Sequence, residues 1–238
     1  ERGKGKRKGG RGEGRKGRKR GGKEKGGGEG ERRKGKGKKR EGGRERGGKK
    51  EKKERKRRRK RDAFGASNSR HSINRKLAAY AAQRVDGAEV DLLALNDYEL
   101  PIYSIDREKE SGIPQLVHDF KQKISAADAL VMALAEHNGA YTAAFKNILD
   151  WVSRLEGKTW AGRHLLLLAT SPGKRGGRSV LELASRSFPF FGAQSIASFS
   201  LPGFYQNFSD TEGITDASLR QAFEQALQTF VQQLEGRG

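Results

Sequence analysis

Two runs of strand length most constrain how this chain can fold, because their side chains are almost all apolar. They cover residues 129–135 (ALVMALA) and 164–170 (HLLLLAT). A strand that is exposed on one face alternates polar and apolar residues, whereas a strand buried on both faces does not. These runs therefore predict two central strands of a sheet that is covered by helices on both sides.

The segments around these runs have the spacing that such a fold requires. Apolar residues recur at helical intervals over residues 73–85, 113–124, 141–155, 180–188 and 219–234, and further strands are predicted over 88–95 and 195–201. Strands that alternate with helices favour a parallel sheet. We therefore expect an α/β fold with a doubly wound parallel sheet in three layers.

Residues 1–61 differ from the rest, since they contain only Glu, Arg, Gly and Lys. They hold 33 Lys and Arg and 9 Glu, whereas the other 177 residues hold 18 Lys and Arg and 20 Asp and Glu. A segment without apolar side chains is expected to be disordered. We thus divide the chain into a basic tail, 1–61, and a folded domain, 62–238. The tail is interpreted either as an arm for nucleic acid or as the translation of a purine-rich repeat.

Composition also excludes several kinds of protein. The chain has no Cys, which excludes disulfides, a thiolate nucleophile and zinc sites with Cys ligands. No apolar run reaches the roughly 20 residues of a membrane span, and no secretory signal is recognisable. We expect a cytoplasmic protein with no membrane partner.

Ligands of open α/β sheets bind beyond the carboxyl ends of the strands, so the loops there are the candidate site. The first such loop, residues 65–74, offers short polar side chains ahead of a helix, from Ser67, Ser69, Ser72 and Asn74. Hydroxyl groups and the free N–H groups of a helix N-terminus suit a phosphate. An ordinary capped helix is the alternative interpretation.

Two further loops follow the apolar strands. The loop after residues 129–135 contains Ala135, Glu136, His137, Asn138 and Gly139, and its Asn-Gly pair favours a turn. The loop after residues 164–170 contains Ser171, Gly173 and Gly176, and its glycines would let the backbone approach a flat ligand. We predict no acid–base catalytic residue, since His137 has no nucleophile beside it in the sequence.

In this order the loops resemble those of the NADPH-dependent FMN reductase family, which has a flavodoxin-like fold. The family's phosphate loop, G-S-x-R-x-x-S-x-N, is matched by Ser67, Ser72 and Asn74, with Ser69 where Arg is common. Residues 135–140 are similar to its P-E-Y-N-G-S segment and residues 145–151 to its L-K-N-A-I-D-W helix.

The resemblance implies FMN held at the carboxyl edge of the sheet, with its phosphate on the first loop and its ring beside the other two. It implies NADPH or NADH as the electron donor, a small-molecule acceptor, and a homodimer or homotetramer. The helix after the second loop would lie near the subunit interface, with Trp151 or Phe145 partly buried between subunits.

Two departures from the family pattern stand out. His137 replaces the usual Tyr. The chain also has the charged run 57–61 where the family has a central apolar strand, so only Ala63 and Phe64 are expected to remain of that strand. This absence favours the interpretation that the basic tail has replaced the true N-terminus.

The leading hypothesis is thus a flavin-dependent oxidoreductase that passes hydride from NAD(P)H through FMN to a quinone, azo compound, metal ion or free flavin. One alternative is a nucleic-acid-associated protein that uses the basic tail. Another is a flavodoxin-like electron carrier that does not react with NAD(P)H. The sequence distinguishes neither the acceptor nor the preferred nicotinamide.

Overall fold

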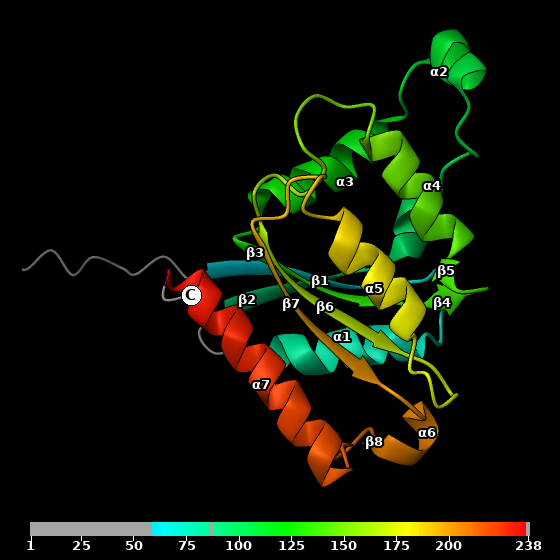
Figure 1. Ribbon diagram of the computed structural model, residues 1–238. Helices are drawn as coiled ribbons and strands as arrows, with labels where there is room; N and C mark the ends of the chain where they lie inside the picture. Colours follow the sequence, from blue (N-terminus) through cyan, green and yellow to red (C-terminus); the bar gives the residue numbers. More distant parts are fainter. Residues whose placement is uncertain (1–58, 86–87, 237–238) are drawn as a thin grey trace, which may run out of the picture. The chain divides into compact units, whose positions relative to one another are not determined.

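A five-stranded parallel sheet forms the centre of the domain. The computed structural model describes residues 59–85 and 88–236, and the predicted tail lies outside these residues except for Arg59–Arg61. The strands are β1 (Arg59–Ala66), β2 (Ala88–Leu93), β3 (Ala129–Leu134), β6 (His164–Thr170) and β7 (Ser195–Leu201). Their spatial order is β2-β1-β3-β6-β7 (Figure 1). This is the doubly wound flavodoxin-like order, and it confirms the predicted fold class.

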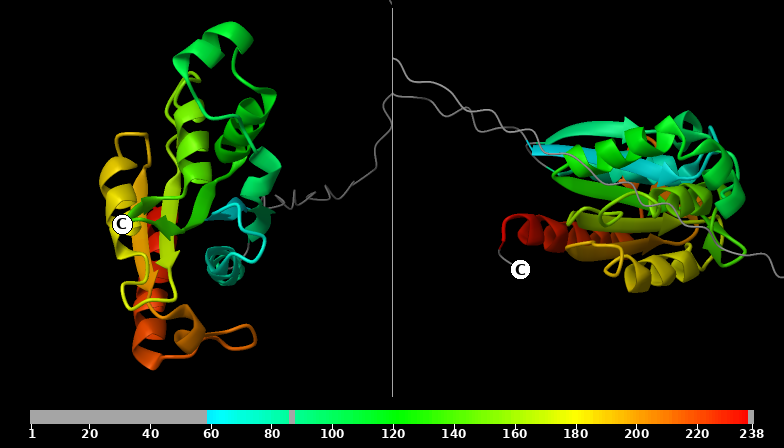
Figure 2. Two further views of the ribbon diagram at one scale, coloured as in Figure 1. Left: turned by 90° about the vertical axis from the view of Figure 1, so that its right-hand side faces the viewer. Right: turned by 90° about the horizontal axis from the view of Figure 1, so that it is seen from above.

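Helices cover both faces of this sheet (Figure 2). The helices α1 (Ile73–Gln83) and α7 (Ala217–Leu234) pack on one face. The helices α3 (Gln115–Ala126), α4 (Ala143–Val152) and α5 (Arg178–Ser187) pack on the other. Short elements complete the domain: η1 (Leu95–Tyr98), α2 (Ile105–Ser111), β4 (Glu136–His137), β5 (Ala140–Tyr141), α6 (Phe204–Asn207), β8 (Phe208–Ser209) and β9 (Gly213–Ile214).

Strand β3 shows why the apolar runs predicted buried strands. Leu130, Met132 and Leu134 face the side of α3, α4 and α5, whereas Val131 and Ala133 face α1 and α7, and all five are fully buried. Both faces of the strand thus lie in a core, which leaves no position for a polar side chain.

The expectation that the first strand is missing is wrong. Strand β1 pairs in parallel with β2 on one side and β3 on the other, and it begins before the expected boundary between residues 61 and 62. Its apolar half supplies the packing, because Phe64 is fully buried with its ring 5.9 Å from Phe120 and 6.1 Å from Phe145. Strand pairing uses backbone groups, so charged residues at the amino end do not prevent it.

The one charged side chain of β1 that the structure describes, Asp62, is buried beside a cation. Asp62 lies in register with Asp91 of β2. Lys123 of α3 forms an ion pair with Asp91 at 2.6 Å, and its pKa is raised mainly by Asp91 and to a smaller extent by Asp62. The buried Asp62 of β1 is therefore accompanied by the positive charge of Lys123 from α3.

Helix α4 differs from expectation in how it is buried. Phe145 and Trp151 have no exposed surface within the chain itself. The expectation that one of them is partly buried between subunits is therefore wrong, because both already belong to the core between α4 and the sheet.

Among the residues that the structure describes, none of the helices has the length and apolar composition of a membrane span.

Candidate functional site

The first predicted loop joins β1 to α1 and is held by its own hydroxyl groups. Ser67 Oγ accepts a hydrogen bond from Ser69 N at 3.2 Å, and Ser72 Oγ accepts one from Arg75 N at 3.2 Å. Ser72 is the N-cap of α1, as the alternative interpretation of this loop predicted. Ser69 is exposed, so the loop combines a structural cap with a hydroxyl that faces solvent.

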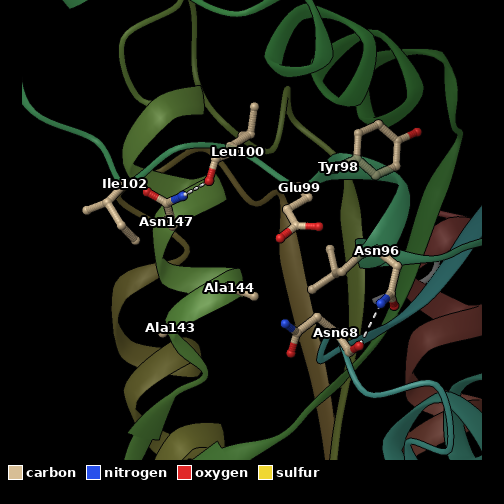
Figure 3. Close-up of a pocket in the computed structure, with 10 residues that line it drawn as sticks. Asn68, Asn96, Tyr98, Glu99, Leu100, Ile102, Ala143, Ala144 and Asn147 are labelled. Carbon is tan, nitrogen blue, oxygen red and sulfur yellow. Dashed lines mark hydrogen bonds between the residues drawn. The ribbon is translucent and has the colours of Figure 1, made fainter. Parts of the chain in front are cut away.

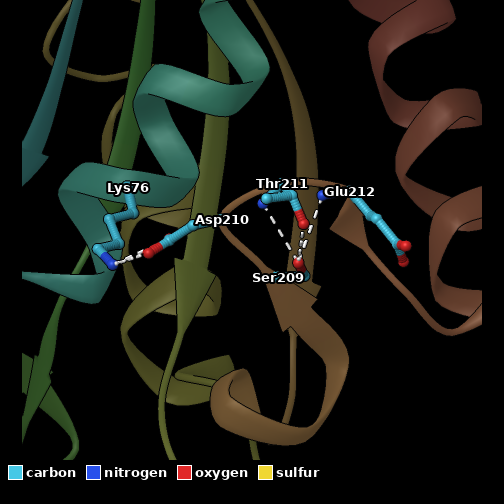
Figure 4. A network of polar contacts seen from close by, with 5 residues as sticks. All are labelled: Lys76, Ser209, Asp210, Thr211 and Glu212. Atoms are coloured by element: carbon cyan, nitrogen blue, oxygen red, sulfur yellow. Dashed lines mark hydrogen bonds and ion pairs between the residues drawn. The ribbon is translucent and has the colours of Figure 1, made fainter.

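The amino end of α1 is electrically suited to an anion. Its first turn contains no acidic residue that would neutralise the positive end of the helix dipole. Arg70 is exposed in the loop and Arg75 is partly exposed in the first turn. A third cation, Lys76, is engaged elsewhere, because it pairs with Asp210 of the β8–β9 turn at 2.7 Å (Figure 4).

Asn74 joins the first loop to the third. Its Nδ2 donates to Thr170 O at 3.1 Å, and its Oδ1 accepts from Thr170 N at 3.0 Å. Asn74 is 3% exposed and Thr170, the last residue of β6, is 1% exposed. Both ends of this amide are therefore engaged with the backbone of a strand 96 positions away, rather than turned towards an open anion site.

The second predicted loop is a tight hairpin formed by β4 and β5. Asn138 and Gly139 occupy its turn with φ angles of 52° and 76°, and a positive φ at both turn positions explains the Asn-Gly pair. His137, Asn138 and Gly139 are exposed. The hairpin therefore presents a short stretch of backbone and one imidazole to the carboxyl edge of the sheet.

Two side chains attach this hairpin to its neighbours. Glu136 Oε2 accepts a hydrogen bond from Val180 N at 3.0 Å, which caps the amino end of α5 from a distant part of the chain. Tyr141 OH lies 3.2 Å from Ser187 Oγ at the other end of α5. Burial raises the pKa of Tyr141, and the contact with Ser187 offsets this by less.

Thr142 joins the second loop to the first. Its Oγ1 donates to Ala66 O at the end of β1, at 3.1 Å, and accepts from Phe145 N as the N-cap of α4. Thr142 is 2% exposed. We call Asn74, Thr142 and Glu136 the three connecting residues. Asn74 links the first loop to the third, Thr142 links the second to the first, and Glu136 links the second to helix α5, which follows the third.

The third predicted loop packs against β7. Its residue Ser171 accepts a hydrogen bond at its carbonyl oxygen from Phe204 N, and Gly173 accepts one from Gly203 N, both at 3.0 Å. Gly176 has a φ of 59°, and a Cβ there would lie 2.5 Å from Ser200 Oγ and 2.7 Å from Pro202 N. The close approach that requires Gly176 is therefore an approach to the protein's own strand. Gly173, by contrast, is exposed.

A pocket of about 210 Å³ opens beside the first loop, between it and α4 (Figure 3). Its polar lining comes from Asn68, Asn96, Tyr98, Glu99 and Asn147, and its apolar lining from Leu95, Leu100, Ile102, Ala143 and Ala144. Burial raises the pKa of Tyr98.

Most of the pocket wall comes from the segment 95–102, which lies outside the three predicted loops. The segment follows β2 at the same edge of the sheet as the other loops. The rule that ligands bind beyond strand ends would have included it.

The structure offers little to a metal ion in the residues that it describes, since they contain no group of three or more His, Cys, Asp or Glu side chains that could hold one. The residues that the structure brings together are hydroxyls, amides, backbone N–H groups and arginines. Such a donor set suits an organic phosphate with a planar ring.

Comparison with known proteins also indicates a flavin-binding family. The sequence pattern of the NADPH-dependent FMN reductase family matches residues 63–206. An NADPH:quinone oxidoreductase of Arabidopsis thaliana is 30% identical over 65% of this chain and 81% of its own length. An uncharacterised protein of Mycoplasma pneumoniae is 32% identical over 63% of this chain and 91% of its own length.

Solved structures share the fold. The NAD(P)H:acceptor oxidoreductase FerB of Paracoccus denitrificans is 24% identical, with a TM-score of 0.59 over 76% of this chain and 99% of its own. An NADH:FMN oxidoreductase is 22% identical, with a TM-score of 0.55 over 72% of this chain and 88% of its own.

Proposed function

This chain belongs to the NADPH-dependent FMN reductase family, and on that premise we propose that it transfers electrons from NADPH or NADH, through bound FMN, to a quinone or azo acceptor. Membership makes it an NAD(P)H-dependent flavin oxidoreductase. The class of acceptor is the part that we propose, and the Arabidopsis relative, an NADPH:quinone oxidoreductase by name, supports it.

The first loop is the proposed phosphate site. Hydroxyl groups come from Ser67, Ser69 and Ser72. The first N–H groups at the amino end of α1 have no acceptor within the helix and suit an anion, and the first turn contains no acidic residue that would compete for them. Arg70 and Arg75 add positive charge at the rim. The role that we propose for Asn74 is indirect, because its amide is bonded to Thr170 and holds the third loop against the first.

The second and third loops are the proposed ring site. Ala135, Glu136, His137, Asn138 and Gly139 would face the flavin ring mainly through their backbone, since Glu136 is engaged with α5 and Gly139 has no side chain. On the other side, Ser171, Gly173 and Gly176 supply a backbone that the start of α6 and the end of β7 hold in place.

When bound, FMN supplies the redox chemistry, because its ring accepts hydride from a nicotinamide and passes electrons on. The chain's own residues bind the phosphate, fix the ring between two loops and leave one face open. No general base is required in this scheme. His137→Phe should therefore change NADPH oxidation by no more than a few-fold.

The observation that carries the proposal is the junction of three loops at one sheet edge beside a helix N-terminus without acids. We therefore expect the purified protein to bind FMN with visible flavin absorption. Ser69→Ala and Ser72→Ala should each weaken FMN binding about tenfold or more, because a hydrogen bond to a charged group contributes roughly 1.5–3 kcal/mol.

Riboflavin is the matched control ligand, since it lacks the phosphate. It should bind the wild type and both serine variants equally weakly. If both variants bind FMN as tightly as the wild type does, the phosphate loop is assigned wrongly. If the protein binds FMN but does not oxidise NADPH or NADH, the alternative of an electron carrier is correct.

A further inference from the structure

The loop after β2 forms one wall of the pocket, and little apolar burial holds it there. Leu95 is buried, but no residue from 96 to 116 is. Helix α2 stands clear of the sheet in Figure 1 and contains no buried residue. Tyr98, Leu100 and Tyr103 pack against the core but are only partly buried, so polar contacts contribute to the position of this wall.

Apart from the hydrogen bond from Asn96 Nδ2 to Asn68 O, the contacts described here come from α4, and chiefly from one amide. Asn147 Nδ2 donates to Leu100 O at 3.1 Å and to Pro101 O at 3.2 Å, and its Oδ1 accepts from Tyr103 N at 2.9 Å. Asn147 is 8% exposed and uses every hydrogen-bonding atom of its side chain on this loop.

A second side chain of α4 adds to this attachment. Trp151 Nε1 donates to Pro101 O at 2.8 Å, and the Trp151 ring lies edge-on to Tyr103 at 5.1 Å. Beyond the loop, Glu108 of α2 accepts hydrogen bonds from Tyr103 OH at 2.9 Å and Arg154 Nε at 2.8 Å. Asn147 makes three of these bonds and is the central contact.

The pocket adjoins two of the three loops that we assign to the flavin. Asn68, in its lining, lies between Ser67 and Ser69 of the phosphate loop, and Ala143 follows Thr142 at the end of the hairpin. Figure 3 shows the Asn68 amide and the Glu99 carboxylate turned towards α4, across the pocket from Ala143 and Ala144. The space therefore lies next to the proposed ring site, within reach of a second planar molecule.

We propose that Asn147 is a positioning residue that fixes the wall of an acceptor pocket, and that this pocket takes a small neutral quinone. The proposal rests on the proposed function. Five apolar residues line the space, which favours a ring, and a volume of about 210 Å³ suits one of small size. The Glu99 carboxylate disfavours anionic acceptors such as sulfonated azo dyes.

The test is steady-state kinetics of the FMN-loaded enzyme with NADPH and varied 1,4-benzoquinone. Asn147→Ala should raise the KM for benzoquinone at least tenfold and lower kcat less than threefold, because the loop loses its anchor while the flavin stays in place. Trp151→Phe removes one hydrogen bond instead of three and should raise this KM by a smaller factor.

Ser153→Ala is the matched control. It removes the bond from Ser153 Oγ to Asp150 O at the end of the same helix, away from the loop, and should leave both constants unchanged. The FMN dissociation constant, measured for each variant, should stay within twofold of the wild type. If Asn147→Ala does not fold, Trp151→Phe provides the same comparison.

Three outcomes would overturn the inference. The first is a benzoquinone KM in Asn147→Ala within twofold of the wild type. The second is a parallel loss of FMN affinity, which would mean that the flavin itself occupies the pocket. The third is an equal rise of KM in Ser153→Ala.

Failure of the proposed function would look different. Wild type that oxidises neither NADPH nor NADH with either benzoquinone or ferricyanide would contradict the oxidoreductase assignment. Turnover with ferricyanide but none with benzoquinone would contradict the quinone pocket alone.

Discussion

Replacing Asn74 with alanine should lower the free energy of unfolding by about 2–4 kcal/mol. The side chain makes two hydrogen bonds to Thr170, at 3.1 and 3.0 Å, and both residues are almost fully buried. Alanine would leave the Thr170 N–H and carbonyl without these partners, and each orphaned buried group costs roughly 1–3 kcal/mol. The loss is therefore larger than that for an exposed hydrogen bond.

Thermal unfolding followed by circular dichroism measures this loss. For a domain of this size, 1 kcal/mol corresponds to a shift of the midpoint by about 2–4 °C, so Asn74→Ala should unfold roughly 5–15 °C below the wild type. Asn96→Ala is the matched control, because exposed Asn96 makes a single hydrogen bond, from Nδ2 to Asn68 O at 2.7 Å. It should shift the free energy by no more than about 0.5 kcal/mol.

Flavin binding adds a second measurement to the same variant. Loss of Asn74 should weaken FMN and riboflavin by the same factor, because it frees the third loop from the first and removes no group that we assign to the phosphate. Equal midpoints for Asn74→Ala and Asn96→Ala would refute the reasoning. Unchanged stability with a loss of FMN affinity alone would instead restore direct contact between Asn74 and the phosphate.

Three further perturbations test other contacts. Glu136→Ala should lower the thermal midpoint and weaken flavin binding. Glu136→Gln keeps an acceptor for Val180 N and should stay close to the wild type in both assays. Equal losses in the two variants would contradict the capping role. Phe64→Ala should cost about 3–5 kcal/mol in urea unfolding, because the ring is fully buried in β1, and a loss below about 1 kcal/mol would mean that β1 is not a packed strand. The hydrogen bond from Arg154 holds the pKa of Glu108 below its usual range. The contribution of Glu108 to stability is therefore complete above its usual pKa and is lost as the pH falls through the lowered pKa. Thermal midpoints between about pH 5 and pH 3 should fall more steeply in the wild type than in Glu108→Gln, and parallel curves would contradict this.

The fold was predictable wherever burial determines the residue type. Strand β6 (His164–Thr170) and strand β7 (Ser195–Leu201) have the predicted bounds, because the apolar run and the strand end together. The predicted strand over residues 88–95 instead ends at Leu93, where the chain turns into η1. Periodicity does not distinguish the end of a strand from an apolar residue in the turn that follows it.

The first strand escaped prediction because a parallel strand needs apolar residues only where its side chains meet a core. In β1 that part is Ala63, Phe64 and Ala66, and the backbone of Arg59 to Asp62 continues the pairing with β2. The charged run 57–61 contains no apolar residue, so its pattern does not indicate a strand. The ion pair between Lys123 and Asp91, which lies close to Asp62, depends on helix packing that a local pattern does not contain.

In the candidate site, local roles were predictable and distant ones were not. The N-cap at Ser72 and the Asn138-Gly139 turn follow from residue types over a few positions. The contacts of Asn74 with Thr170 and of Glu136 with Val180 span 96 and 44 positions. Nothing in a single sequence relates these pairs, so their connecting roles required the three-dimensional structure.

The three connecting residues also distinguish the loop positions that the fold requires from those that tolerate substitution. Asn74, Thr142 and Glu136 hold the loops from within, while His137 and Lys174 are exposed on the same loops and carry no part of that framework. A library randomised at the exposed positions should therefore retain folded, flavin-binding members at high frequency. Such a scaffold is well placed for directed evolution towards new electron acceptors, because changes in specificity need not cost stability.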